Sequence, residues 1–249
     1  MNEWDRNLDQ TGQHYMIDKK LIKFIVDEAM LEKDDVVLEI GYGHGELTRE
    51  IVKKCNVIAI DIEKKHLDIK SANLHVIHGN ILKEIDKLKF TKIVSNIPYN
   101  ISEPLMRKLF KIDFDLCVLT MGKNFADNLS KKDNRIGIIA NHFYNIEILK
   151  IVKPASFYPR PQVDSAFVRI EPKNLDDLSE SDILMRELIF LDDKKLKNAF
   201  EKIFKEKTKN ELNALMKDAK IKFFNKKIYE LSNEEFVLLD DSLIQLGEK

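Results

Sequence analysis

The chain has 249 residues, of which 44% are hydrophobic and 33% charged, and its formal net charge at pH 7 is −1. This composition is typical of a globular protein with one large domain, or one domain and a small addition, and it excludes wholesale disorder. No run approaches the roughly 18 apolar residues of a membrane span. The segment from Met1 to Asp9 lacks the apolar core of a signal peptide, so we expect a cytoplasmic protein.

The first organised part of the chain is a helix that begins after Asp18. Apolar residues recur at helical spacing there, at Leu21, Ile22, Ile25, Val26 and Ala29. The Asp18 side chain can cap this helix. The short apolar run at residues 35–40 is typical of a buried parallel strand. It leads into Gly41-Tyr42-Gly43-His44-Gly45, and a second helix is expected from Glu46.

The glycine-rich turn predicts a ligand site. Glycine permits positive φ and lets a ligand approach the backbone closely. The order strand, glycine turn, helix gives such a turn credibility, although its spacing is not that of a dinucleotide fingerprint. Glu39 before the turn argues against a pyrophosphate, because its carboxylate would repel one, so a cationic or neutral group fits better. The alternative is an ordinary tight turn between strand and helix.

Further strands are expected at residues 56–60, 74–78, 92–95 and 116–120, with helices between them. This alternation predicts an α/β fold with a doubly wound, Rossmann-like parallel sheet. Asp61 follows the second strand, where an acidic residue can bind the two hydroxyls of a ribose. Asn80 follows the third strand and is placed to contact an adenine edge.

The fourth strand ends in Asn96-Ile97-Pro98-Tyr99, ahead of a helix that we expect Ser102 to cap. Pro98 fixes φ and forces a turn, which presents an amide and an aromatic ring at the carboxyl end of the strand. The Asn96 carboxamide can accept hydrogen bonds from an exocyclic amine, and the Tyr99 ring can stack on a base. The alternative is an ordinary Asn-x-Pro turn with a half-buried tyrosine.

The chain resembles the S-adenosylmethionine-dependent adenine N6-dimethyltransferases of small-subunit rRNA. Four motifs carry this resemblance in order along the chain, at residues 12–18, 39–48, 96–102 and 154–165, the last reading Pro-Ala-Ser-Phe-Tyr-Pro-Arg-Pro-Gln-Val-Asp-Ser. The resemblance extends from about Gly12 to Pro172 and is fainter at residues 195–199. It implies S-adenosylmethionine as cofactor, no metal, and rRNA within a small ribosomal subunit as the partner of a monomeric enzyme.

The resemblance also implies roles for individual residues. Those that would bind the cofactor are Gln13, His14, Met16, Glu39, Gly41, Gly43, Asp61, Asn80 and Asn96. Asp61 stands where the family usually has Glu, and Asn80 where it usually has Asp. Asn96 and the Ile97 carbonyl, held by Pro98, would receive the protons of the target N6. Tyr99 would stack on the flipped adenine, and Phe157 would cover its other face.

The implied chemistry needs no covalent intermediate, because the sulfonium is already a strong electrophile and the enzyme's main task is to position the amine. Two alternatives stay open. One is a methyltransferase of large-subunit rRNA, which would share the Asn-Ile-Pro-Tyr turn. The other is a catalytically silent RNA-binding or assembly factor, motivated by Asn80 and by Gly122-Lys123-Asn124, where the family usually has a Gln-Lys-Glu-like segment.

From residue 174 onward the apolar residues recur at helical spacing, which predicts a small helical domain. We therefore expect a methyltransferase domain at residues 1–173 and an RNA-docking domain at residues 174–249. Residues 194–227 carry 12 lysines against 4 acidic residues, which makes this basic block a candidate phosphate-binding surface. The alternative is a solvated helical face. Cys55 and Cys117 lie in apolar, strand-like segments without a CxxC partner, so we expect reduced core thiols.

Overall fold

The computed structural model describes residues 13–64, 67–218 and 221–247. The chain divides into two compact units, one of residues 1–127 and 146–172, the other of residues 128–145 and 173–249. The expected domains at residues 1–173 and 174–249 stay a prediction. The second compact unit also includes residues 128–145. They include a helix, α7 (Arg135–Phe143), that packs against the helices of the second unit.

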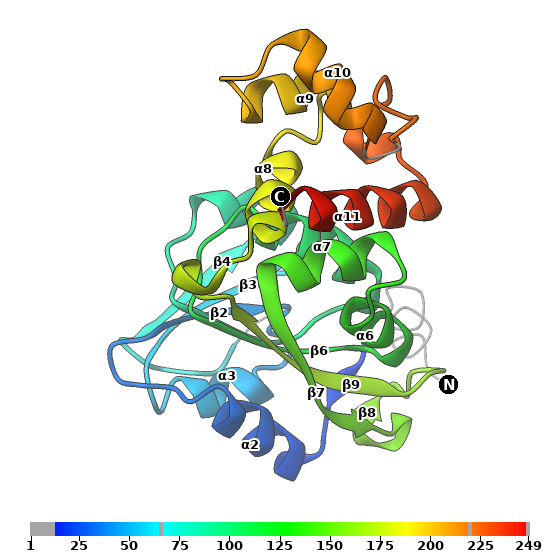
Figure 1. Ribbon diagram of the computed structural model, residues 1–249. Coiled ribbons are helices and arrows are strands. Elements are labelled where there is room, and N and C mark those ends of the chain that lie inside the picture. Colours follow the sequence, from blue (N-terminus) through cyan, green and yellow to red (C-terminus); the bar gives the residue numbers. More distant parts are fainter. Residues whose placement is uncertain (1–12, 65–66, 219–220, 248–249) are drawn as a thin grey trace. The chain divides into compact units, whose positions relative to one another are not determined.

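A mixed sheet of seven strands forms the centre of the first unit, in the order β4-β3-β2-β5-β6-β9-β7 (Figure 1). The strands are β2 (Val36–Ile40), β3 (Asn56–Asp61), β4 (Leu74–His78), β5 (Lys92–Asn96), β6 (Leu116–Gly122), β7 (Tyr144–Val152) and β9 (Ser165–Pro172). The strands from β2 to β6 are parallel, which confirms the predicted α/β fold. The last two strands were not predicted, and β9 runs antiparallel to β6.

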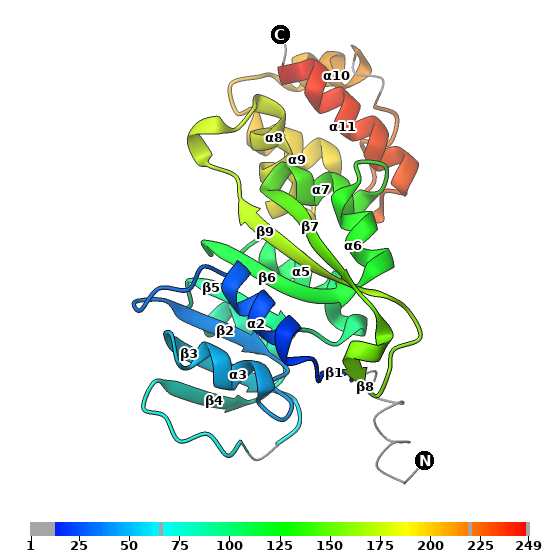
Figure 2. The same cartoon turned by 90° about the horizontal axis from the view of Figure 1, so that it is seen from below.

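Helices cover both faces of the parallel strands. The helical segments of the first unit are α2 (Lys19–Glu28), α3 (Glu46–Ile51), α4 (Ile81–Glu84), η1 (Ile85–Lys87), η2 (Tyr99–Ile101), α5 (Ser102–Leu109), α6 (Lys123–Ser130, which continues into the second unit) and η3 (Pro154–Ser156). Figure 2 shows α2 and α3 on one face of the sheet and α5 on the other. Strands covered on both sides must be apolar on both faces, which is why β2, β3, β5 and β6 read as apolar runs, whereas β4 at the edge of the sheet is largely exposed.

The sequence predicts Asp18 and Ser102 as helix caps, and the structure shows how each of these two helices begins. The Asp18 carboxylate accepts hydrogen bonds from the backbone N–H groups of Lys20 and Leu21, which confirms Asp18 as the cap of α2. Ser102 does not cap α5, because the 3-10 turn η2 leads directly into that helix and Ser102 is already its first helical residue. Its hydroxyl is buried without a hydrogen-bond partner.

The strand order creates a switch point beside β2. From β2 the chain proceeds through β3 to β4, and then crosses back to form β5 on the other side of β2. Connections that leave neighbouring strands in opposite directions open a crevice at the carboxyl ends of those strands. Gly41 follows β2 and Asn96 ends β5, so both lie at this crevice.

The second unit is helical. It contains α7, η4 (Leu175–Asp177), α8 (Glu180–Phe190), α9 (Leu196–Ile203), α10 (Lys209–Asp218), η5 (Ile228–Glu230) and α11 (Asn233–Gly247). His142 joins three of its helices: Nδ1 lies 2.8 Å from Asp182 Oδ1 on α8, and Nε2 lies 2.5 Å from Asp240 Oδ1 on α11. No helix within the described ranges is both long and apolar enough to cross a bilayer.

Asp182 makes this cluster sensitive to acid. Burial alone would raise the pKa of its carboxyl, but hydrogen bonds from Lys173, Ser179 and His142 lower that pKa from 3.8 to about 2. A carboxyl whose pKa is lower in the folded protein stabilises the fold above its unfolded pKa, and that stabilisation is lost as the pH falls towards the folded pKa.

We expect an Asp182→Asn variant to be less stable than the wild type at pH 7 and to lose less stability between about pH 5 and pH 2. Urea unfolding followed by circular dichroism across that range would measure the difference. Asp177→Asn is the matched control, since Asp177 is an exposed acid of the same unit. Parallel pH profiles for the wild type and Asp182→Asn would contradict the expectation.

Candidate active site

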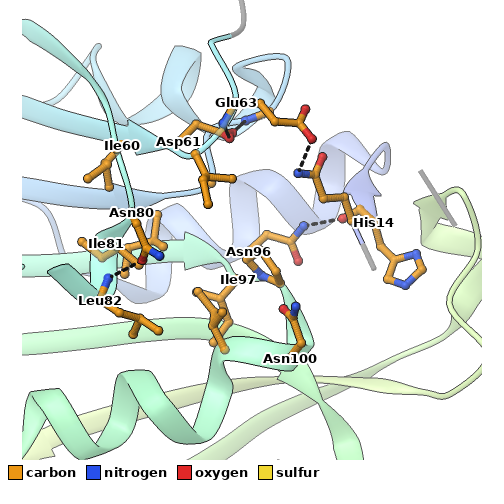
Figure 3. A pocket seen from close by; sticks show the side chains of 18 of the residues that line it. His14, Ile60, Asp61, Glu63, Asn80, Ile81, Leu82, Asn96, Ile97 and Asn100 are labelled. Atoms are coloured by element: carbon orange, nitrogen blue, oxygen red, sulfur yellow. Dashed lines mark hydrogen bonds between the residues drawn. The ribbon is translucent and has the colours of Figure 1, made fainter. Parts of the chain in front are cut away.

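A cavity of about 350 Å³ opens at the switch point of the sheet. Its lining comes from the carboxyl ends of β2, β3, β4 and β5, from the turns that follow them, and from the segment before β1 (Tyr15–Met16) (Figure 3). The lining residues are Gln13, His14, Tyr15, Ile40, Gly41, Gly43, Ile60, Asp61, Ile62, Glu63, Gly79, Asn80, Ile81, Leu82, Asn96, Ile97, Pro98, Asn100 and Ile101. The volume suits a nucleoside-sized ligand, since sites for small molecules span about 300–1,000 Å³.

The glycine turn forms one wall of the cavity. Gly41, Gly43 and Gly45 have φ angles of 74°, 56° and 83°, in the left-handed region that favours glycine. A Cβ atom on Gly43 would lie 2.6 Å from Cε1 of Tyr15, so even alanine would displace that ring. The turn is therefore shaped both by its own backbone and by the close packing of Tyr15.

Asp61 holds the glycine turn against the end of β3. Its side chain is buried, and its two carboxylate oxygens accept hydrogen bonds from Gly43 N at 3.2 Å and Glu63 N at 2.9 Å. Gln13 Nε2 donates to Glu63 Oε1 at 3.3 Å, and both residues line the cavity. Sequence reasoning missed Glu63, although an acid two residues after Asp61 was an available signal, and it missed Tyr15.

Asn80 begins α4 and borders the cavity beyond β4. Its Oδ1 accepts the backbone N–H of Leu82 at 2.9 Å, as an N-cap does. The amide nitrogen could donate to a ligand in the cavity, and a carboxamide oxygen retains a second lone pair. An asparagine at this position can therefore cap α4 and also present a polar group to the cavity.

Asn96 is the most distinctive polar group of the site. Its Nδ2 donates to the backbone oxygen of His14 at 2.6 Å, which fixes the orientation of the amide (Figure 3). Its Oδ1 is buried and has no hydrogen-bond partner. Ile97 N donates to Thr120 O at 3.2 Å, so the turn stays attached to β6. A buried acceptor without a partner is costly, so Asn96 Oδ1 is a candidate acceptor for a donor group of a ligand in the cavity.

Two predicted cofactor residues do not line this cavity. Met16 and Glu39 border a neighbouring cavity of about 30 Å³, which Gly41 and Asn96 also line. Tyr99 lies outside both cavities: its hydroxyl is hydrogen-bonded to the Ser165 hydroxyl, and its ring lies against Gly122. Burial raises the pKa of the Tyr99 phenol, and the bond to Ser165 opposes that rise.

Phe157 is placed in the hydrophobic core. It lies in β8 (Phe157–Tyr158), opposite Met16 of β1, and its side chain is 1% exposed. Because successive residues of a strand face opposite sides, the next residue, Tyr158, is 48% exposed. The structure therefore does not bring Phe157 to the cavity, and its contact with a base stays a prediction that requires Phe157 to leave this packing.

The parallel sheet, the glycine turn and the Asn-Ile-Pro-Tyr turn at its switch point define the chain as a Rossmann-like methyltransferase. A model of the family described as "Ribosomal RNA adenine dimethylase" matches residues 5–241. The chain belongs to this family and is therefore an rRNA adenine methyltransferase.

Relatives and solved structures agree with this assignment. The chain is 33% identical over 263 residues to "Probable ribosomal RNA small subunit methyltransferase A" of Methanococcus aeolicus, which covers 96% of this chain and 97% of the relative. The protein of the same name from Methanopyrus kandleri is 33% identical over 220 residues, 84% of this chain and 76% of the relative. A dimethyladenosine transferase structure from Plasmodium falciparum has a TM-score of 0.65 at 25% identity, covering 94% of this chain and 98% of that one.

Proposed function

We propose that this enzyme transfers methyl groups from S-adenosylmethionine to N6 of adjacent adenosines in small-subunit rRNA during ribosome biogenesis. The observation that carries the proposal is the buried Oδ1 of Asn96, an oriented acceptor without a partner at the edge of a cavity of nucleoside size. A primary amine on an adenine edge is the donor that this oxygen fits.

The residues of the cavity fit the cofactor in the order expected from the strand ends. Asp61 would accept hydrogen bonds from the ribose hydroxyls, since its carboxylate lines the cavity at the end of β3 and a carboxylate oxygen can accept more than one hydrogen bond. Asn80 would contact the adenine edge, and the apolar side chains of Ile60, Ile81 and Leu82 would pack against its ring. The methionine part would lie along Gln13, His14 and Gly41.

When bound, the cofactor supplies an electrophilic methyl group on a sulfonium. The enzyme's own contribution is to orient the target amine, because the N6 lone pair is delocalised into the adenine ring. Acceptors at Asn96 Oδ1 and the Ile97 carbonyl would bind the N6 protons and stabilise the positive charge that N6 gains as it is methylated. The target adenine would first leave the base stack of the RNA. Tyr99, whose hydroxyl is hydrogen-bonded to Ser165, would then stack on it.

The substrate and the setting follow from the relatives and from the second unit. The archaeal relatives are named as small-subunit methyltransferases. A structure of the 23S rRNA methyltransferase ErmE is 19% identical, with a TM-score of 0.58, so its likeness concerns the fold alone. The exposed lysines of the second unit would contact rRNA phosphates. A monomeric protein in the cytoplasm, where ribosomes are assembled, fits this role.

Incubation of the purified protein with radiolabelled S-adenosylmethionine and separated ribosomal subunits, followed by mapping of the modified base, tests the proposal. We expect label on adenine N6 of small-subunit rRNA. Label on large-subunit rRNA would show that the substrate is large-subunit rRNA and would contradict the proposed one. Cofactor binding without label on either subunit or its precursor would favour the silent assembly factor.

Asp61→Ala tests the cofactor site directly. We expect S-adenosylmethionine binding to weaken by about 1–3 kcal/mol, because a charged hydrogen bond to the ribose is lost. Titration calorimetry of the folded variant measures this difference. Asp68→Ala is the matched control, since Asp68 is an exposed acid further along the same connection that does not line the cavity. Unchanged affinity in Asp61→Ala would remove Asp61 from the site.

A further inference from the structure

A buried carboxyl lies directly behind the glycine turn. Glu39 is the fourth residue of β2, and its side chain is 2% exposed. It borders the cavity of about 30 Å³. Gly41 and Asn96 line both this cavity and the larger one. Glu39 Oε2 has no hydrogen-bond partner. Such a position is costly for a charged carboxylate, because burial removes its hydration and no opposite charge compensates for that loss.

The groups around Glu39 supply negative charge and no positive charge. Glu46 at the start of α3 and Asp61 at the end of β3 are the charged groups that face it, and Thr48 on α3 is a polar neighbour. The other polar or titratable groups that line the small cavity are the phenols of Tyr15 and Tyr42 and the amide of Asn96, while α2 contributes Ile22. No lysine, arginine or histidine among the described residues lines it.

This environment determines the protonation of Glu39. Burial raises the pKa of its carboxyl from 4.5 to about 8, Thr48 opposes the rise, and the carboxylates of Glu46 and Asp61 add to it. Around neutral pH, Glu39 therefore holds a proton in the protein without cofactor.

We propose that Glu39 releases this proton when the positively charged cofactor binds, so that the carboxyl behind the glycine turn changes from neutral to anionic. The inference rests on the proposed function, because it needs a cationic ligand in the larger cavity. The O–H bond of Glu39 breaks, the electron pair stays on the carboxylate, and the proton passes to the solvent.

The geometry supports this coupling. Ile40 and Gly41, the two residues after Glu39, line the larger cavity, and Gly41 and Asn96 border both cavities. A cationic ligand held in the larger cavity would therefore be separated from the carboxyl by the backbone of the glycine turn. In a low-dielectric interior, a nearby opposite charge favours the ionised form of an acid. The anion in turn strengthens the binding of the cation, so cofactor affinity should rise with pH until Glu39 is already ionised in the free protein.

Titration calorimetry in two buffers with different ionisation enthalpies counts the protons released on binding. For the wild-type protein we expect release of nearly one proton from Glu39 at about pH 7 and nearly none at about pH 9.5. The cofactor's own α-amino group titrates in the same range, so the measured quantity is the difference between the wild type and Glu39→Gln. S-Adenosylhomocysteine, which lacks the sulfonium charge, should release fewer protons than S-adenosylmethionine.

Glu46→Gln is the matched control. It removes a neighbouring negative charge but keeps the Glu39 carboxyl, so the release of a proton should persist with its midpoint at a lower pH. This variant and the wild-type pH profile also test the proposal if Glu39→Gln does not fold. Normal cofactor binding with no proton release above that of Glu39→Gln, or a midpoint unmoved in Glu46→Gln, would overturn the inference. Absence of cofactor binding in the wild type would instead refute the proposed function.

Discussion

An Asn96→Ala variant should bind S-adenosylmethionine within a few-fold of the wild-type affinity, yet lose about 10²–10³ in kcat for methyl transfer. The reason is that Asn96 Oδ1 is buried, oriented by the bond from Nδ2 to His14 O, and without a hydrogen-bond partner, so we expect it to bind the target amine. Removing one oriented hydrogen-bonding group at a reacting centre has an effect of this size, because the Ile97 carbonyl would bind only one of the two N6 protons. Single-turnover kinetics with labelled cofactor, together with calorimetry, would separate chemistry from binding.

Two further variants make this test specific. Asn100→Ala is the matched control, because Asn100 also lines the cavity but has no assigned contact with the reacting amine. We expect it to stay within a few-fold of the wild type. Asn96→Asp keeps an acceptor oxygen but loses the donor to His14, so activity partly retained in this variant would indicate that the acceptor is the important atom. Weak cofactor binding with normal turnover at saturation in Asn96→Ala would reverse the assignment.

The second large effect concerns the basic block at residues 194–227. Replacement of Lys195, Lys197 and Lys202 by Glu should weaken binding to rRNA or to the small subunit by about 10² at low salt. It should also flatten the dependence of affinity on salt, by about one unit of slope for each phosphate contact that is lost. Lys195 and Lys202 are exposed, and Lys197 and Lys202 lie on α9. Filter binding over a range of salt concentrations would measure both quantities.

Cofactor binding should be unchanged in this triple variant, because every residue that lines the larger cavity belongs to the first unit. Lys19, Lys20 and Lys23 are exposed on α2 of the first unit, and their replacement by Glu is a control with the same change of charge. Equal losses in the two triple variants would indicate general electrostatic attraction rather than a docking surface. Wild-type affinity in the α9 variant would contradict the assignment.

In that case Arg160, which is exposed, would be the next candidate for RNA contact. Arg135, another arginine that could contact RNA, stabilises the fold of the second unit. It donates to the Tyr229 backbone oxygen at 2.7 Å and lies 5.2 Å over the ring of Phe236. Its substitution would therefore disturb folding and binding together.

The sequence by itself determined the parallel part of the sheet and the location of the site. Strands buried on both faces read as apolar runs, so β2, β3, β5 and β6 were recognisable without tertiary information. Asp61, Asn80 and Asn96 could be brought together because each follows or ends such a strand, and parallel strands have their carboxyl ends at one edge. Local chemistry also determined the cap at Asp18 and the positive φ of the glycine turn.

Other features were decided by the tertiary structure. β7 is exposed along much of its length, so its sequence lacks a buried strand's apolar run, and its place in the sheet depends on β9. Residues 128–145 belong to the second unit because α7 packs against α8 and α11. The local sequence pattern of α7 does not indicate which helices it packs against. Phe157 faces the core and Tyr158 faces the solvent because the pairing of β8 with β1 determines which side chain points to which face. A shift of this register by one residue would exchange the two positions. The raised pKa of Glu39 likewise arises from burial and from carboxylates that are distant in sequence or on the next helix, and only folding brings them together.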